Sequence, residues 1–109
     1  MASLKQEVFV IVLLNNKHCY LTDMLITKGI LNKSLVHCRE VFAPAIVYRA
    51  AAIIACHNHP SGDPQPSPED IAITKRIQEA GKIIGIPLID HIVFGGDRYF
   101  SFAAEGILM

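Results

Sequence analysis

The sequence of 109 residues has no tryptophan, three cysteines and no excess of charge of either sign. Lysine plus arginine equal aspartate plus glutamate at 10 each, so the chain lacks the basic surplus with which proteins hold nucleic acid or anionic lipid. A nucleic-acid partner is therefore not expected from the charge. With 51% apolar and 18% charged residues, the chain is predicted to form one domain over residues 1–109.

The cysteines and the apolar runs indicate in which cell compartment the protein is expected. Cys19, Cys38 and Cys56 nowhere form Cys-x-x-Cys, which argues against a disulfide framework and a thiolate zinc site and favours a reducing compartment. The apolar run Val8–Leu14 is too short to cross a bilayer and has no cleavage pattern after it. We therefore expect a cytoplasmic protein with no membrane partner.

Short apolar runs separated by turn residues predict a sheet. The first two runs flank polar residues 15–17 and the last two flank residues 95–98, so each pair is expected to form a hairpin. The continuous apolar run from Ala50 to Cys56 has the pattern of a strand buried on both faces. Strands are predicted at 8–14, 20–26, 30–37, 50–56, 88–94 and 99–102.

Two helices are predicted between these strands. The first covers 39–49, and Pro44 within it is tolerable only near the first turn, since deeper in it would kink the helix. The second has Ser67 as its expected N-cap, Pro68 at its first position and Gly85 at its end. The chain is thus expected to be an α/β domain.

Three candidate metal ligands follow the buried middle strand. His57 and His59 are two residues apart, and in extended backbone such residues project to the same side, so both imidazoles can reach one ion. Asp70 lies in the first turn of the second helix, and a proline-rich loop can fold it back toward the strand. Three protein ligands are usual for a catalytic zinc and leave one tetrahedral position for a water.

Each part of this group also has a simpler explanation. A His-x-His pair alone is more often a surface or core feature than a metal site. The segment Ser67-Pro68-Glu69-Asp70 alone is accounted for by a helix capping box. Only the longer pattern favours a metal site.

In order, the chain gives His57-x-His59, seven residues, Ser67, two residues and Asp70. This spacing resembles the signature of JAMM metallopeptidases, and the fuller string from His57 to Pro64 resembles their bacterial RadC branch. The resemblance implies a mixed β-sheet flanked by helices, in the sandwich that is similar to that of cytidine deaminases. Further matches are Ser34-Leu35-Val36-His37, Arg39-Glu40, Thr74, Asp90-His91-Ile92-Val93 and Tyr99-Phe100-Ser101.

The resemblance also implies roles for single residues. The three ligands would hold zinc (Zn2+), Ser67 would help to stabilise an oxyanion, and an upstream glutamate would act as general acid/base. Glu7, at the start of the first strand, is the expected glutamate; Glu40 is the alternative, although the helix dipole explains its position. Asp90 and His91 either support the metal site or, more simply, form a satisfied buried polar pair.

Two positions depart from the pattern of the family that the chain resembles. Cys38 stands where many members have proline, and Asn58 stands where deubiquitinating relatives have serine or threonine, which puts ubiquitin-like substrates in doubt. Members also commonly carry an N-terminal helical region, so we expect either a short form or an excised domain.

Two functions compete at this point. The first is a zinc-dependent hydrolase that cuts a peptide or isopeptide bond in a peptide or protein substrate. The second is a non-catalytic metal-binding module associated with DNA repair or mobile elements, as the family's historical name implies. The neutral charge and the complete ligand set favour the hydrolase. The spacing of the histidines excludes an HNH nuclease, and the missing Pro-Cys-x-x-Cys excludes a zinc nucleobase deaminase.

Overall fold

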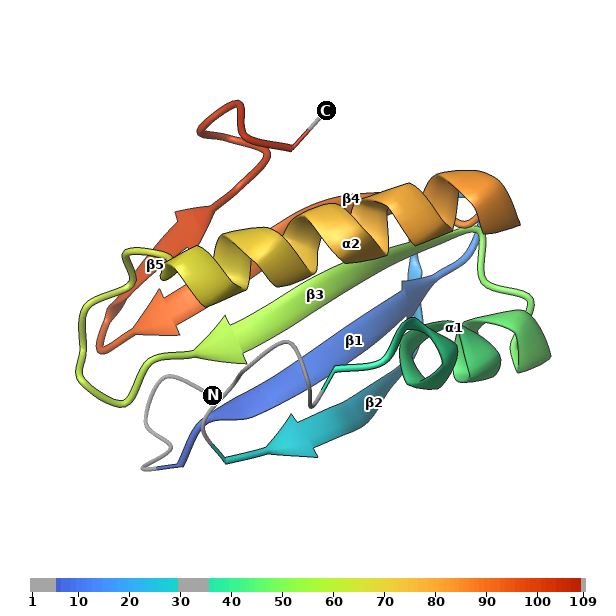
Figure 1. Cartoon of the computed structure of the whole chain (residues 1–109). Helices are drawn as coiled ribbons and strands as arrows, with labels where there is room; N and C mark the ends of the chain where they lie inside the picture. Colours follow the sequence, from blue (N-terminus) through green and yellow to red (C-terminus); the bar gives the residue numbers. More distant parts are fainter. Residues whose placement is uncertain (1–5, 30–35, 109) are drawn as a thin grey trace.

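The structure, a computed structural model, describes residues 6–29 and 36–108. Five strands form one mixed sheet in the order β2-β1-β3-β4-β5, covered by two helices (Figure 1). The α/β architecture with a mixed sheet and helices is therefore confirmed. In chain order the elements are β1 Val8–Leu14, β2 Tyr20–Lys28, α1 Cys38–Val47, β3 Ala52–Asn58, α2 Pro68–Ile84, β4 Leu88–Gly95 and β5 Arg98–Ser101.

The strand pairing brings distant parts of the chain to one end of the sheet. β3 pairs with β4 in parallel and with β1 antiparallel. Because the β1–β3 register sets Phe9 opposite His57, the residues before β1 lie beside the end of β3. Both predicted hairpins are present, β1–β2 and β4–β5. The second turns on Gly96, whose φ of 59° suits the first central position of a two-residue hairpin loop.

The hydrophobic core lies between the sheet and the two helices. Helix α1 also contacts helix α2. Phe42 of α1 and Ile73 and Ile77 of α2 are almost fully buried, as their helical spacing requires. Burial of each such side chain is worth about 1.5–3 kcal/mol. The largest buried apolar side chains are Phe9, Phe42, Phe102, Ile11, Leu13, Ile53, Ile73 and Ile77.

Helix α1 departs from the expectation for Pro44. The helix begins at Cys38 and continues past Pro44, beyond its first turn, and the N–H of Tyr48 donates to the Pro44 carbonyl at 2.9 Å. The carbonyl that loses its donor belongs to exposed Glu40, where water can bond it. The expectation that Pro44 is tolerable only near the first turn was therefore wrong, and the kink expected deeper in the helix stays a prediction.

Two further expectations concern a strand at 30–37 and the absence of a membrane span. Of the strand predicted at 30–37, residues 30–35 lie outside the described residues, and Val36 and His37 are not in a strand. Within the described ranges, no helix combines the length and the apolar character needed to span a membrane.

Candidate metal centre

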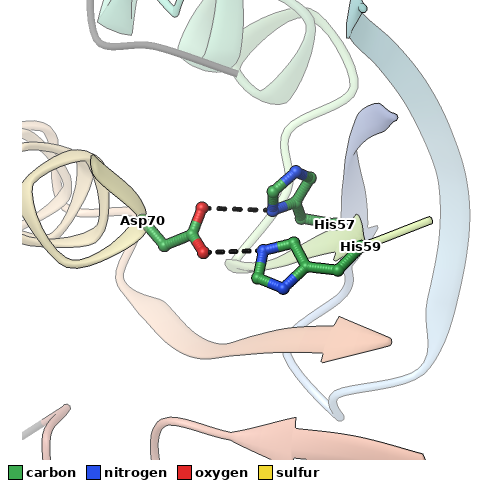
Figure 2. A group of neighbouring side chains, drawn as sticks. All are labelled: His57, His59 and Asp70. Atoms are coloured by element: carbon green, nitrogen blue, oxygen red, sulfur yellow. Dashed lines mark hydrogen bonds and ion pairs between the residues drawn. The ribbon is translucent and has the colours of Figure 1, made fainter. Parts of the chain in front are cut away.

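Three segments converge at one end of the sheet. His57 is near the end of β3, His59 follows it, and Asp70 projects from the first turn of α2 toward both imidazoles (Figure 2). Glu7 comes from the residues just before β1. The end of a parallel strand and the start of the next helix form a common place for ligands in α/β sheets.

The spacing of these side chains fits a metal ion. His57 Nδ1 lies 3.2 Å from Asp70 Oδ1, and His59 Nε2 lies 2.9 Å from Asp70 Oδ2. One ligand atom from each residue can be chosen so that all lie within 4.8 Å of one another. Ligands placed about 2.0–2.1 Å from a tetrahedral zinc are about 3.3 Å apart, so the group could close around the ion with small shifts.

The hydrogen-bond inventory also favours a cation. His59 Nδ1 lies 2.9 Å from the carbonyl oxygen of Asp63, which only accepts, so this nitrogen carries the proton of the neutral ring. The lone pair of His59 Nε2 then faces Asp70 Oδ2. Because both atoms are hydrogen-bond acceptors, this contact is favourable only with a proton or a metal ion between them. His57 Nδ1 and Asp70 Oδ1 are buried 3.2 Å apart, and neither makes a hydrogen bond within the described part of the chain, so a cation between them would satisfy both.

The charges of the group are strongly coupled. Burial on its own would raise the pKa of Asp70, but contacts with His57 and with the N–H of Ser67 outweigh it and hold the pKa well below its usual range. Burial on its own would lower the pKa of His57, but attraction to Asp70 and then to Glu7 outweighs it and raises the pKa. Asp70 is therefore an anion at neutral pH, as a metal ligand must be.

The two candidate glutamates lie in different places. Glu7 Oε2 is 3.2 Å from His57 Nε2, and its side chain is 24% exposed, so it borders both the ligand group and solvent. Glu40 is on the surface of α1, where it lies 3.7 Å from the Arg39 guanidinium. The structure thus brings Glu7, and not Glu40, to the candidate ligands.

Asn58, between the two histidines, has a role that the sequence interpretation missed. Its Oδ1 accepts from the N–H of Val8 at 2.7 Å, and its Nδ2 donates to the carbonyl of Gln6 at 3.0 Å. These bonds hold the backbone on both sides of Glu7 against the end of β3. The side chain is nearly fully buried, so the amide is a fixed clamp.

We expect Asn58→Ala to cost about 1–3 kcal/mol of stability, because the mutation leaves the buried N–H of Val8 without its partner. For a domain of this size the loss corresponds to a fall of at least about 4 °C in melting temperature. Asn16→Ala, at an exposed turn, is the control and should change stability by less than about 0.5 kcal/mol. Equal melting temperatures of the two variants would contradict the clamp.

Ser67 is the N-cap of α2, as the sequence predicted. Its hydroxyl accepts from the N–H of Asp70 at 3.1 Å, and its own N–H donates to Asp70 Oδ2 at 2.8 Å. This capping box fixes the Asp70 carboxylate before any metal binds. The hydroxyl proton of Ser67 is not used in these bonds and is available for donation.

A buried polar chain supports Asp70 from behind. The hydroxyl of Thr74 donates to the Asp70 carbonyl at 2.7 Å and therefore accepts from Nδ1 of His91. The His91 ring, fully buried, stacks on Phe102, and within the described ranges its Nε2 has no hydrogen-bond partner. Asp90 Oδ1 instead accepts from the backbone N–H of His91, and Asp90 Oδ2 accepts from the hydroxyl of Ser101. The expectation that Asp90 and His91 form a satisfied buried polar pair is therefore wrong, because His91 Nε2 finds no partner among the described residues.

His91 makes the metal-free protein sensitive to acid. Burial lowers its pKa from 6.5 to about 4, so between these values the unfolded chain binds a proton that the folded chain does not. The contribution is fully present above pH 6.5 and is lost as the pH falls toward 4, by roughly 3 kcal/mol in total. Denaturant titrations of His91→Gln should show a flatter acid limb than those of the wild type, and parallel acid limbs would contradict this role of His91.

The comparisons with known proteins agree with this geometry. The family model described as RadC-like JAB domain matches residues 1–107. The chain is 51% identical to a UPF0758 protein of Trichlorobacter lovleyi over 104 residues, which are 95% of this chain and 45% of the relative. It is 52% identical to a UPF0758 protein of Clostridium beijerinckii over 108 residues, 99% of this chain and 47% of the relative.

The chain spans about half the length of these curated relatives. Within that half, the family model covers all the described strands and helices and every candidate ligand. The family match is consistent with the mixed sheet, its two helices and the His-His-Asp group beside the end of β3. The chain belongs to the RadC-like JAB domain family.

Proposed function

We propose that this domain is a zinc-dependent hydrolase that cleaves a peptide or isopeptide bond. The observation that carries the proposal is the His57, His59 and Asp70 group with the Glu7 carboxylate 3.2 Å from one of its rings. Two neutral nitrogens and one carboxylate form the donor set of several catalytic zinc sites. A zinc ion held there would polarise a carbonyl oxygen and lower the pKa of a water to about 7.

The protein's own groups would handle the proton and the substrate. Glu7 is partly exposed and has no role as a ligand in this scheme, so its carboxylate can accept a proton on the solvent side and return it to the leaving amine. The clamp formed by Asn58 keeps this carboxylate within reach. Such positioning limits the freedom that the reacting groups must lose.

Ser67→Ala separates two roles of the hydroxyl. Loss of the N-cap should cost about 1 kcal/mol of stability whatever the chemistry. If the hydroxyl also donates to the developing oxyanion, turnover should fall about 10²-fold or more while zinc content stays the same. Zinc analysis, melting temperature and turnover on one sample distinguish these outcomes, and a loss of stability alone would confine Ser67 to capping.

The proposal is tested directly on the wild-type chain. We expect about one tightly held zinc ion per chain after purification without added metal, and hydrolysis of at least some members of a broad peptide and isopeptide library. Chelation should abolish this hydrolysis, and added zinc should restore it. A protein that holds zinc but cuts no member of the library would favour a non-catalytic metal-binding module.

A further inference from the structure

An open cavity of about 630 Å³ lies at the edge of the sheet nearest β5. One wall is formed by Pro64 and Gln65, from the loop between His59 and Asp70. The other wall is formed by residues 97–100, from β5 and the turn before it, together with Glu105. The loop that carries the candidate ligands thus also lines this cavity.

The shared loop is held tightly against the β4–β5 hairpin. Gly95 leaves room for it, because a Cβ there would lie only 2.5–2.8 Å from backbone atoms of the loop. Arg98 Nη2 donates to the Gly62 carbonyl at 3.3 Å, and the ring of His59 donates to the Asp63 carbonyl at 2.9 Å. One side of the loop therefore holds a candidate ligand, and the other side faces the cavity.

Among the described strands, β5 pairs only with β4, so its other backbone edge is open at this cavity. β5 is the last strand of the sheet, and its register sets Phe100 opposite Val93. The N–H of Phe102 donates to the His91 carbonyl, so by the alternation of an antiparallel ladder the N–H and carbonyl of Tyr99 point away from β4. An extended peptide can pair with such a residue as an added strand.

The side chains around this edge favour a positive charge. Asp97 and Glu105 make no ion pair with any residue in the described part of the chain. Arg98 also lines the cavity and keeps its positive charge while it donates to a loop carbonyl, so the two carboxylates leave the lining with a net negative charge. Tyr99, 68% exposed, and Phe100 add aromatic rings, on which a lysine or arginine side chain can lie.

We propose that this cavity and the free edge of β5 dock an extended, basic segment of the protein substrate. The inference rests on the proposed function and names its substrate class: chains with lysine or arginine beside the bond that is cut. β5 lies two strand spacings, about 10 Å, from β3. About three extended residues would span that distance, so one segment can occupy both places.

The test is a binding measurement on the zinc-loaded Glu7→Gln protein, in which the peptide should stay whole. The probe is a fluorescein-labelled eight-residue peptide of alternating valine and lysine, followed by polarisation and by amide chemical shifts. We expect shifts at Gln65 and Tyr99, and at least about fivefold weaker binding by an added Asp97→Asn, Glu105→Gln pair. The matched pair Glu40→Gln, Glu79→Gln makes the same charge change on the helices and should bind as the parent does.

Altered peptides test the chemistry of docking. A peptide with glutamate in place of lysine should bind at least about fivefold more weakly. Two further peptides carry N-methyl groups on alternate amides, one on the odd-numbered and one on the even-numbered residues. Only the peptide whose methylated amides face β5 should fail to pair with it as an added strand. Equal binding of the lysine and glutamate peptides, or shifts confined to other surfaces, would overturn the inference. If docking holds but wild-type protein cuts no peptide, the hydrolase proposal fails alone; if peptides are cut without this docking, the inference fails alone.

Discussion

Glu7→Gln should lower peptide turnover by about 10²- to 10⁴-fold while the fold and the zinc content stay the same. The amide has the shape of the carboxylate but accepts no proton at neutral pH. The 3.2 Å contact with His57 can persist, because the amide can still bond the ring. The loss should therefore fall mainly on kcat, and the melting temperature should change little.

Glu40→Gln is the matched control for this variant. It makes the same chemical change on the exposed face of α1, where Glu40 only borders Arg39. Its turnover should equal that of the wild type. Inactive Glu40→Gln beside active Glu7→Gln would reverse the assignment of the base, and a Glu7→Gln protein without zinc would show that Glu7 is a ligand.

The local signals in the sequence predicted most of the fold. Ser67, Pro68 and Gly85 placed both ends of α2 because capping and proline geometry are properties of a few adjacent residues. Gly96 placed the last hairpin for the same reason. Pro44 misled because the effect of proline depends on the exposure of a carbonyl four residues earlier, which no local pattern gives.

The candidate site was only partly predictable. The two-residue period of a strand placed His57 and His59 on one side, and the helix start placed Asp70. The clamp of Asn58 on Gln6 and Val8 could not be foreseen, because it depends on the register of β1 on β3 across about fifty residues. A shift of that register by one residue would turn Asn58 away from β1. The link from Asp70 through Thr74 to His91 depends on how α2 packs on β4, so the sequence offered support of the metal site by His91 only as one of two expectations.

A His57→Ala, His59→Ala double variant should lose zinc, from about one ion per chain to none above background. Each substitution removes a nitrogen donor, so the loss of affinity should exceed the 10- to 100-fold typical of residues that only support a ligand. The Asp70 carboxylate would remain in its capping box, which keeps α2 in place. Metal analysis after dialysis, with circular dichroism on the same samples, measures both quantities.

The same site should release zinc on acidification. Attraction to Asp70 and Glu7, which outweighs burial, raises the pKa of His57 above 6.5, so protons compete with the metal as the pH falls through that raised value.

Chelation at neutral pH should lower the melting temperature without unfolding the domain at room temperature, because the apolar core between the sheet and the helices does not depend on the ion. Full zinc occupancy in the double variant would refute the ligand assignment, and complete unfolding on chelation would refute the independence of the core.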